Sequence, residues 1–186
     1  MTTARHVVVL VGSLRQESLN RKVAQVLVEL AASSLKLEIV EIGHLPLYNM
    51  DLESNVPEAW ASFRDTVRRA EAALFVTPEY NRTVPGVLKN AIDVGSRPYG
   101  KSVWSKKPAA VVSVSPGAMG AFGANHCVRQ SLVFLDMPAM QQPEAYIGGA
   151  DKLFDSSGKL TSDSTRELLK KFVDAFAAWV ERNLRS

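Results

Sequence analysis

The stretch His6-Val-Val-Val-Leu-Val-Gly-Ser-Leu-Arg-Gln-Glu-Ser-Leu-Asn20 decides the fold. Its five consecutive apolar residues, 7–11, are typical of a strand that is buried on both faces, as in a parallel sheet. Apolar residues then recur at helical spacing over residues 19–33, which predicts an amphipathic helix with one buried side. A buried strand that passes through a short polar loop into a helix is the first part of a β-α-β unit.

The same alternation continues to the end of the chain. Apolar patterns predict further strands at residues 35–42, 72–77 and 108–115 and within 139–147, and helices at residues 57–71, 84–94 and 125–135 and from about 161–165 to 184. Strands that alternate with helices form a parallel sheet with helices on both faces. Five strands favour one α/β domain, residues 1–186, with the flavodoxin-like strand order 2-1-3-4-5. Ligands of such sheets bind at the carboxyl ends of the strands, so the loops after the first, third and fourth strands should carry the function.

Composition and charge exclude several classes of protein. Hydrophobic residues make up 46% of the chain and charged residues 22%, which is typical of a soluble globular protein. The net charge is only +3 and no dense block of Lys and Arg occurs, so we expect no nucleic-acid partner. The single cysteine, Cys127, permits neither an internal disulfide nor a cysteine-based zinc site. Because no signal region and no apolar run of ~20 residues occurs, we expect a cytoplasmic protein without membrane partner or bound metal.

The loop after the first strand has the composition of an anion site. It leads into a helix N-terminus, where unpaired N–H groups and the helix dipole favour negative charge. Ser13 and Ser18 add hydroxyls, Arg15 adds a charge and Asn20 adds an amide. The glycine fingerprints of dinucleotide and nucleotide triphosphate sites are both absent, so the loop suggests a single terminal phosphate, as in FMN. The alternative is that Ser18 only caps the helix, and the loop alone does not decide between the two.

Two further loops become informative because the strand order places them beside the first. Residues 77–86 contain two prolines, which limit freedom, and Tyr80, which offers a flat surface with a polar tip. Backbone N–H groups there can address the polar edge of a planar ring, although a rigid turn with a packed tyrosine explains the same residues. Residues 113–124 contain three glycines, which let the backbone approach a ligand. A flexible connector is the alternative for that loop.

Three motifs together resemble the NADPH-dependent FMN reductase family, close to bacterial NAD(P)H quinone and chromate reductases. They are Gly12-Ser-Leu-Arg-x-x-Ser-x-Asn20, Pro78-Glu-Tyr-Asn81 followed by Val84-Pro-Gly-Val-Leu-Lys-Asn-Ala-Ile-Asp93, and Ser115-Pro-Gly117, within roughly residues 5–147. The resemblance implies an FMN phosphate held by Ser13, Arg15, Ser18, Leu19 and Asn20, a flavin ring edge lined by Pro78, Glu79, Tyr80 and Asn81, and a ring and ribityl border at Ser115 and Gly117. It also implies a homodimer or homotetramer with the flavin close to a subunit interface.

The resemblance implies a ping-pong reaction at the flavin. NAD(P)H gives a hydride to N5 of FMN, and a quinone or similar acceptor then takes the same place and receives two electrons. No side-chain nucleophile is needed, and Cys127 and its neighbour His126 point in different directions on a helix. Glu79 is the one carboxylate of the expected site, and a structural role is favoured over that of a general acid. Arg82 is our hypothesis for the residue that holds the 2′-phosphate of NADPH.

Two other functions are compatible with the same fold. One is a flavodoxin-type electron carrier, and the other is an FMN-binding module without a substrate site of its own. Such carriers are generally acidic, so the net charge of +3 argues against the first. A related alternative is a flavodoxin-like binding or regulatory module that has lost its cofactor, and the intact Ser13, Arg15, Ser18 and Asn20 argue against it.

Overall fold

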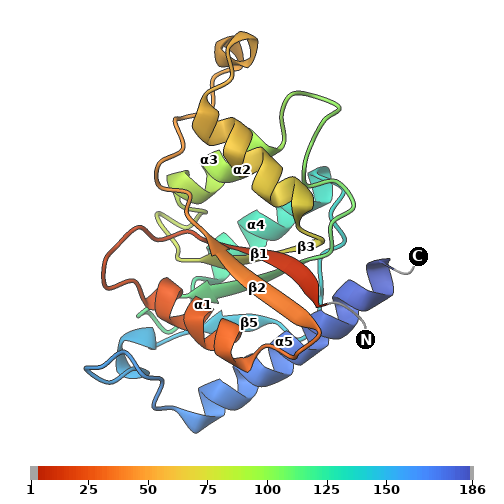
Figure 1. The fold of residues 1–186 in the computed structure, drawn as a ribbon. Coiled ribbons are helices and arrows are strands. Elements are labelled where there is room, and N and C mark those ends of the chain that lie inside the picture. The colour runs from red at the N-terminus through yellow and green to blue at the C-terminus, as the bar shows by residue number, and fades with distance from the viewer. Residues whose placement is uncertain (1–3, 185–186) are drawn as a thin grey trace.

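The computed structural model describes residues 4–184 and contains one five-stranded sheet (Figure 1). The strands are β1 (Arg5–Val11), β2 (Leu35–Val40), β3 (Ala72–Thr77), β4 (Ala109–Val114) and β5 (Ala145–Ile147). All neighbouring pairs are parallel and their order is β2-β1-β3-β4-β5, which confirms the predicted flavodoxin-like topology.

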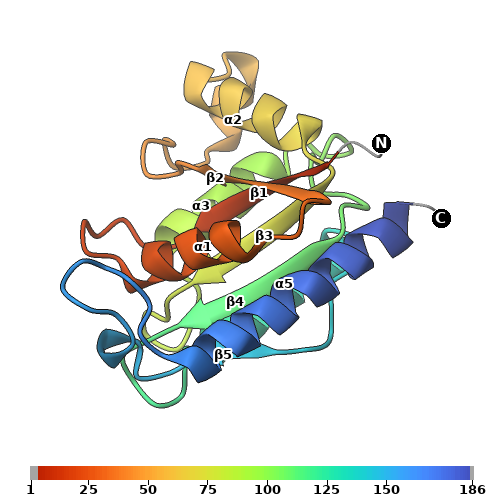
Figure 2. The ribbon, with the colours of Figure 1, turned by 60° about the horizontal axis from the view of Figure 1, so that its bottom comes forward.

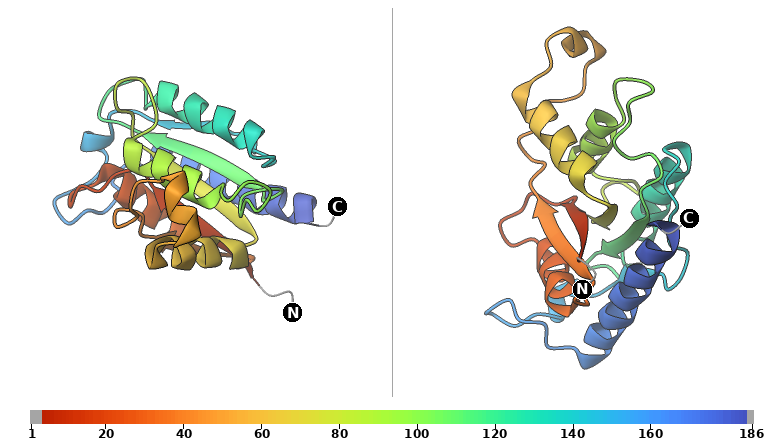
Figure 3. Two further views of the ribbon diagram at one scale, coloured as in Figure 1. Left: turned by 90° about the horizontal axis from the view of Figure 1, so that it is seen from above. Right: turned by 45° about the vertical axis from the view of Figure 1, so that its right-hand side comes forward.

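Helices cover both faces of this sheet (Figures 2 and 3). They are α1 (Leu19–Leu30), α2 (Glu58–Arg69), α3 (Gly86–Gly95), α4 (Phe122–Phe134) and α5 (Asp163–Leu184), with short 3-10 helices η1 (Met50–Ser54) and η2 (Ala150–Lys152). Helices α1 and α5 pack on one face, and α2, α3 and α4 pack on the other.

Each face of the sheet has its own hydrophobic core because successive strand residues point to opposite sides. In β1, Val7 and Val9 contribute to the core under α1 and α5, whereas Val8 and Leu10 contribute to the core under α2, α3 and α4. Every residue of the central strands β3 and β4 is buried. This two-sided burial explains why these strands are continuous apolar runs rather than alternating ones.

Element boundaries differ from the predicted ranges by a few residues, and at three of them the structure shows a local reason. The segment 139–147 pairs with β4 only from Ala145 onward, because Pro143 has no N–H to donate to a ladder; before it, only Ala139 forms an isolated bridge. Helix α1 ends at Leu30 rather than near residue 33, since the chain must turn before β2 begins. Helix α4 begins three residues before the predicted position, after Ala121 adopts a left-handed conformation with φ of 60°.

The parallel arrangement brings the ends of β1, β3 and β4 to the same edge of the sheet. Val11 lies opposite Val76, and Thr77 lies opposite Ser113, so the following loops start side by side. This edge is therefore the place where the residues selected from the sequence can meet.

Candidate functional site

The three loops enclose a hollow of about 270 Å³ at the carboxyl edge of the sheet. It is lined by Ser13, Arg15, Ser18, Leu19, Asn20, Pro78, Glu79, Tyr80, Val114, Ser115 and Pro116. All residues that the sequence analysis assigned to a cofactor line this hollow, except Asn81 and Gly117. The topology thus brings together side chains that are about one hundred residues apart in the chain.

One end of the hollow offers free donors beside a helix N-terminus. Ser18 caps α1, because its hydroxyl oxygen accepts a hydrogen bond from the Arg21 N–H at 3.1 Å. Ser18 therefore does cap the helix, and because its O–H remains able to donate, the cap does not decide between the two roles. Ser13 is buried, and neither its side chain nor that of Arg15 bonds to any other residue between 4 and 184. A free hydroxyl, a free guanidinium and the first turn of α1 together suit an anion.

Asn20 carries an unused hydrogen-bond acceptor inside the protein. Its side chain is 4% exposed, and its Nδ2 donates a long hydrogen bond of 3.5 Å to the carbonyl of Val114. Its Oδ1 has no partner and is one of only two such buried side-chain atoms in the described part of the chain. Leaving a buried acceptor unpaired costs about 1–3 kcal/mol. The position therefore suits a hydroxyl donor of a ligand, such as a ribityl hydroxyl next to a phosphate.

The loop after β3 contains a tight turn with two left-handed residues. Tyr80 and Thr83 exchange two backbone hydrogen bonds, each 3.1 Å long. Between them, Asn81 has φ of 52° and Arg82 has φ of 67°, which is the geometry of a type I′ turn. Asparagine suits such a position but arginine is uncommon there. The turn is rigid as one alternative proposed, but Tyr80 is 47% exposed and is not packed in the interior.

The side chain of Glu79 lies between this turn and α4 and contacts both. Its Oε2 accepts a hydrogen bond from the backbone N–H of Ala124 at 3.1 Å, and its Oε1 lies 3.4 Å from Nη1 of Arg82. Both carboxylate oxygens therefore have partners, which supports the structural alternative over the general acid.

Buried side chains that the sequence analysis missed fix the position of the loop after β4 through hydrogen bonds. The Ser113 hydroxyl donates to the carbonyl of Gly120 at 2.7 Å, and Nδ2 of Asn125 donates to Ser113 Oγ at 3.2 Å. Nε of Arg129 in turn donates to Oδ1 of Asn125 at 2.8 Å. Ser113 and Asn125 are fully buried, so these bonds hold the loop at one position rather than leaving a flexible connector. The available signal was a serine inside a buried strand.

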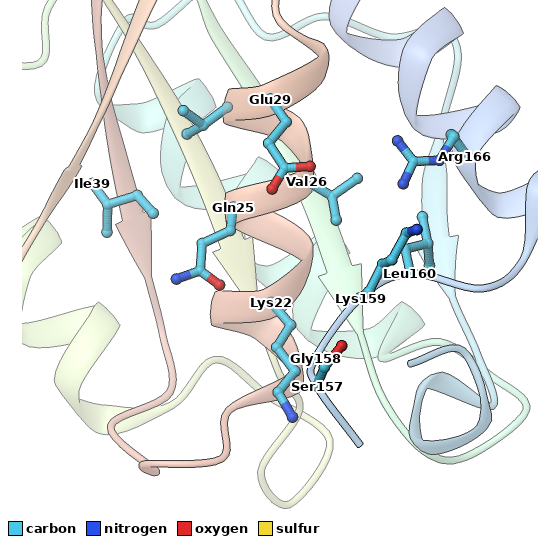
Figure 4. Close-up of a pocket in the computed structure, with 11 residues that line it drawn as sticks. Lys22, Gln25, Val26, Glu29, Ile39, Ser157, Gly158, Lys159, Leu160 and Arg166 are labelled. Carbon is cyan, nitrogen blue, oxygen red and sulfur yellow. The ribbon is translucent and has the colours of Figure 1, made fainter. Parts of the chain in front are cut away.

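A second hollow, of about 570 Å³, is larger than the one at the carboxyl edge and is an alternative candidate site (Figure 4). It lies beside α1 and the segment 157–160, with Glu29 and Arg166 on opposite sides. None of the three loops at the carboxyl edge lines it, and it contains neither of the buried unpaired atoms. Its Lys22 is already paired with Glu17 at 2.8 Å. The smaller hollow is therefore the better candidate site despite its size.

Other reactive side chains form no competing centre. His126 Nε2 lies 3.0 Å from the Tyr146 hydroxyl, and the ring of His126 packs against Phe122. Burial, followed by Glu144, raises the pKa of Tyr146 to about 12. Within residues 4–184, no group of three or more His, Cys, Asp or Glu side chains could hold a metal ion. No helix in that part of the chain is both long and apolar enough to span a membrane.

Comparison with known proteins points to one family. A family model described as NADPH-dependent FMN reductase matches residues 5–152. The chain is 69% identical to a quinone reductase of Pseudomonas putida over 98% of both chains, and 45% identical to a 2-hydroxy-1,4-benzoquinone reductase of Burkholderia over 95% of this chain and 97% of the relative.

Solved structures agree with this result. FerB, a flavoenzyme NAD(P)H:(acceptor) oxidoreductase from Paracoccus denitrificans, superposes with a TM-score of 0.91 at 42% identity, over 97% of this chain and 99% of that one. A flavodoxin from Pseudomonas aeruginosa has a TM-score of 0.56 at 18% identity, over 95% of this chain and 99% of its own. The flavodoxin likeness shows the fold alone.

Proposed function

The chain belongs to the NADPH-dependent FMN reductase family, and from that premise we propose that it passes two electrons from NAD(P)H through FMN to a quinone. FMN supplies the redox chemistry when bound, because its ring takes a hydride from a nicotinamide and returns two electrons to an acceptor. The observation that carries the proposal is the hollow with its free donors and the unpaired Asn20 oxygen. Two relatives named as reductases of quinones support a quinone as acceptor. An electron carrier is disfavoured, because the flavodoxin likeness is weak beside the reductase likeness.

The residues at the hollow divide into two groups by what they offer. We assign the phosphate and ribityl end to Ser13, Arg15, Ser18, Leu19 and Asn20, and the ring end to Pro78, Glu79, Tyr80, Asn81, Ser115 and Gly117. The first group supplies hydroxyls, a cation and a helix N-terminus, which match a phosphate dianion. The second group supplies mainly backbone, held by the I′ turn and by Ser113, which matches a rigid planar ring.

An absorption titration tests the proposal. The purified protein should show flavin bands at ~375 and ~450 nm, either as isolated or after incubation with FMN and removal of the unbound flavin. Anaerobic NADPH should bleach these bands, and a benzoquinone added next should restore them. Bleaching without restoration by any quinone would remove the quinone from the proposal. A protein that takes up no FMN would contradict the assignment of the hollow itself.

We assign the 2′-phosphate of NADPH to Arg82. Its side chain is 80% exposed at the tip of the turn, so it can reach a second ligand at the rim. Its left-handed backbone favours glycine, so an arginine there carries a backbone cost that a role of its side chain would explain. Arg82→Gly removes the side chain without adding backbone strain, and Arg82→Lys is the matched control that keeps the charge. Arg82→Gly should raise the KM for NADPH about tenfold, since a charge-assisted bond is lost, with the KM for NADH nearly unchanged. An equal rise in KM for NADPH and for NADH would mean that Arg82 only stabilises the turn and does not bind the 2′-phosphate.

The proposed reaction order is ping-pong, with nicotinamide and quinone using the same opening in turn. Tyr80, which is 47% exposed at the lining of the hollow, offers a flat surface to either planar group. Initial rates at several fixed quinone concentrations should give parallel double-reciprocal lines. Intersecting lines would require both substrates to be bound together and would contradict a shared place.

We propose a homodimer or homotetramer that uses exposed residues of α4. Phe122, Val133 and Phe134 are 44%, 79% and 79% exposed on this one helix. Large apolar side chains exposed at this level are what an interaction surface buries, and Val133 and Phe134, as neighbours on a helix, face different directions, so the interface would enclose the C-terminal end of α4. Val133→Lys should shift the sedimentation coefficient toward that of the monomer; an unchanged coefficient would move the interface elsewhere.

We also infer a cytoplasmic location, because the only cysteine, Cys127, is a free thiol.

A further inference from the structure

Helix α4 lacks an N-terminal cap of its own. The residue before the helix, Ala121, has no side chain that can accept a hydrogen bond, and the first turn contains no acidic residue. Every helix begins with backbone N–H groups that have no partner inside the helix. This helix end is partly buried, with Ala121 and Ala124 inside, so its N–H groups need acceptors from another part of the molecule.

The missing acceptor comes from the loop after β3, 45 residues earlier in the chain. The carboxylate of Glu79 accepts the N–H of Ala124, the third residue of α4, at 3.1 Å. The side chain of Glu79 is only 13% exposed, so this charge lies against the positive end of the helix with little screening. Its contact with Arg82 is longer, at 3.4 Å, and Arg82 is exposed, which makes that contact the weaker of the two.

Gly123 provides the space for this contact. A Cβ at position 123 would lie 2.9 Å from Oε2 of Glu79 and 2.9 Å from the carbonyl oxygen of Arg82. Any side chain at this position would therefore push the carboxylate away from the helix end. The glycine and the carboxylate form one unit, although they belong to different loops.

The same turn of α4 also anchors the loop after β4. Asn125, next to Ala124, reaches the carbonyl of Gly120 through the hydroxyl of Ser113. Two neighbouring residues of α4 thus hold both loops that form the ring end of the hollow.

We propose that Glu79 is a positioning residue that caps α4 across the chain and fixes the loop 78–83 relative to the loop 115–121. The proposal rests on the proposed function for one consequence only, which is the effect of Glu79 on the affinity for FMN. The cap itself is a property of the protein alone, so it can be tested without the cofactor. Glu79 acts through the backbone of both loops, and no proton transfer to substrate is assigned to it.

Two substitutions at position 79, with a control substitution in α2, separate the cap from other roles. Glu79→Ala removes the acceptor, whereas Glu79→Gln keeps an oxygen that can accept from Ala124. In the protein without FMN, hydrogen exchange of the Ala124 amide should accelerate at least about tenfold in Glu79→Ala and far less in Glu79→Gln. FMN fluorescence titration should show Kd raised about tenfold or more in Glu79→Ala and largely rescued in Glu79→Gln. Glu58→Ala, which removes an exposed acid from the first turn of α2, is the control and should change neither value.

A double-mutant cycle tests the link to Gly123. Gly123→Ala should weaken FMN binding in the native background, because its Cβ displaces the carboxylate. In the Glu79→Ala background the same change should cost less, since the carboxylate is gone; the contact with the Arg82 carbonyl is present in both backgrounds and cancels. If the double variant raises the Kd for FMN by the product of the two single-variant factors, the two residues act independently and the proposal is overturned.

Two further outcomes are decisive. Unchanged exchange of the Ala124 amide in Glu79→Ala would overturn the cap, whatever the effect on FMN. A pH profile of kcat that loses one limb in Glu79→Gln would assign Glu79 as a general acid instead. If the native protein binds no FMN but the exchange results are as expected, the proposed function fails and the cap stands.

Discussion

Replacing Asn20 by leucine should change the stability of the empty protein and its affinity for FMN in opposite directions. Leucine has nearly the same shape as asparagine and no polar atoms, so it fits a site that is 4% exposed. The substitution removes an acceptor that has no partner in the protein and that we assign to a ligand hydroxyl.

The magnitudes follow from the hydrogen bonds of Asn20. The unpaired Oδ1 costs about 1–3 kcal/mol, whereas the bond from Nδ2 to Val114 is 3.5 Å long and contributes little. The protein without FMN should therefore gain about 1 kcal/mol, which raises the Tm by about 2–4 °C for a chain of this length. The loss of one hydrogen bond to the ligand should raise the Kd for FMN about tenfold.

Thermal unfolding without FMN and fluorescence titration with FMN measure the two effects. Asn90→Leu is the matched control, because the amide of Asn90 is also buried but fully used, by Tyr48, Leu45 and Pro46. That substitution should destabilise the protein by about 2–3 kcal/mol. If Asn20→Leu lowers both the Tm and the FMN affinity, Asn20 is a structural residue and its unpaired oxygen does not mark the ligand.

Three other predictions concern the framework around the site. Gly95→Ala places a Cβ 2.5 Å from the buried ring of Trp104 and should lower the free energy of unfolding by about 3 kcal/mol, measured in urea. Glu53→Ala leaves Arg64, whose side chain is 6% exposed, without its carboxylate and should cost about 3 kcal/mol in the same assay; a cost below 1 kcal/mol would mean that the pair is solvated. The pKa of Tyr146 is raised to about 12, so the folded protein holds this proton more tightly than the unfolded chain, and stability should fall as pH rises from 10 to 12. Tyr146→Phe should remove that fall, and an unchanged fall would assign it to other groups.

The fold could be predicted from the sequence because its main determinants are local and repetitive. Uninterrupted apolar runs in β1, β3 and β4 report burial on both faces, and only a parallel sheet covered by helices buries both faces of several strands. The fifth strand was located within residues 139–147, but its start was not, because the sequence does not show where pairing with β4 is continuous. Ala139 forms a single bridge to Ala109, and Met140 donates its N–H to the Ala109 carbonyl at 2.8 Å; the Gln-Gln-Pro-Glu stretch that follows interrupts the pairing until Ala145.

The site could be predicted from the sequence only in part, and the part that was missed depends on contacts between distant residues. Motifs located the loops, and the parallel topology then made them meet, so almost every predicted cofactor residue lines one hollow. The direction of Glu79 could not be predicted, since it depends on a helix that begins after Ala121, a residue type with no capping side chain. Asn125 was placed at the start of a helix without a role, because its partner Ser113 belongs to another element.

Backbone strain alone would not have located the site. Among the described residues, five other than glycine have positive φ, and Asn81, Arg82 and Ala121 are in the loops at the hollow. The remaining two, Lys106 and Asp136, lie near the opposite end of β4, where the Lys106 N–H donates to the Asp136 carbonyl at 2.7 Å. That hydrogen bond joins two connecting segments, and neither residue carries one of the buried unpaired side-chain atoms. The carboxyl edge differs because strain there coincides with an unpaired buried acceptor and a free guanidinium, which are costs that a ligand can remove. That coincidence, rather than either feature alone, is the reason why we propose the hollow as the binding site.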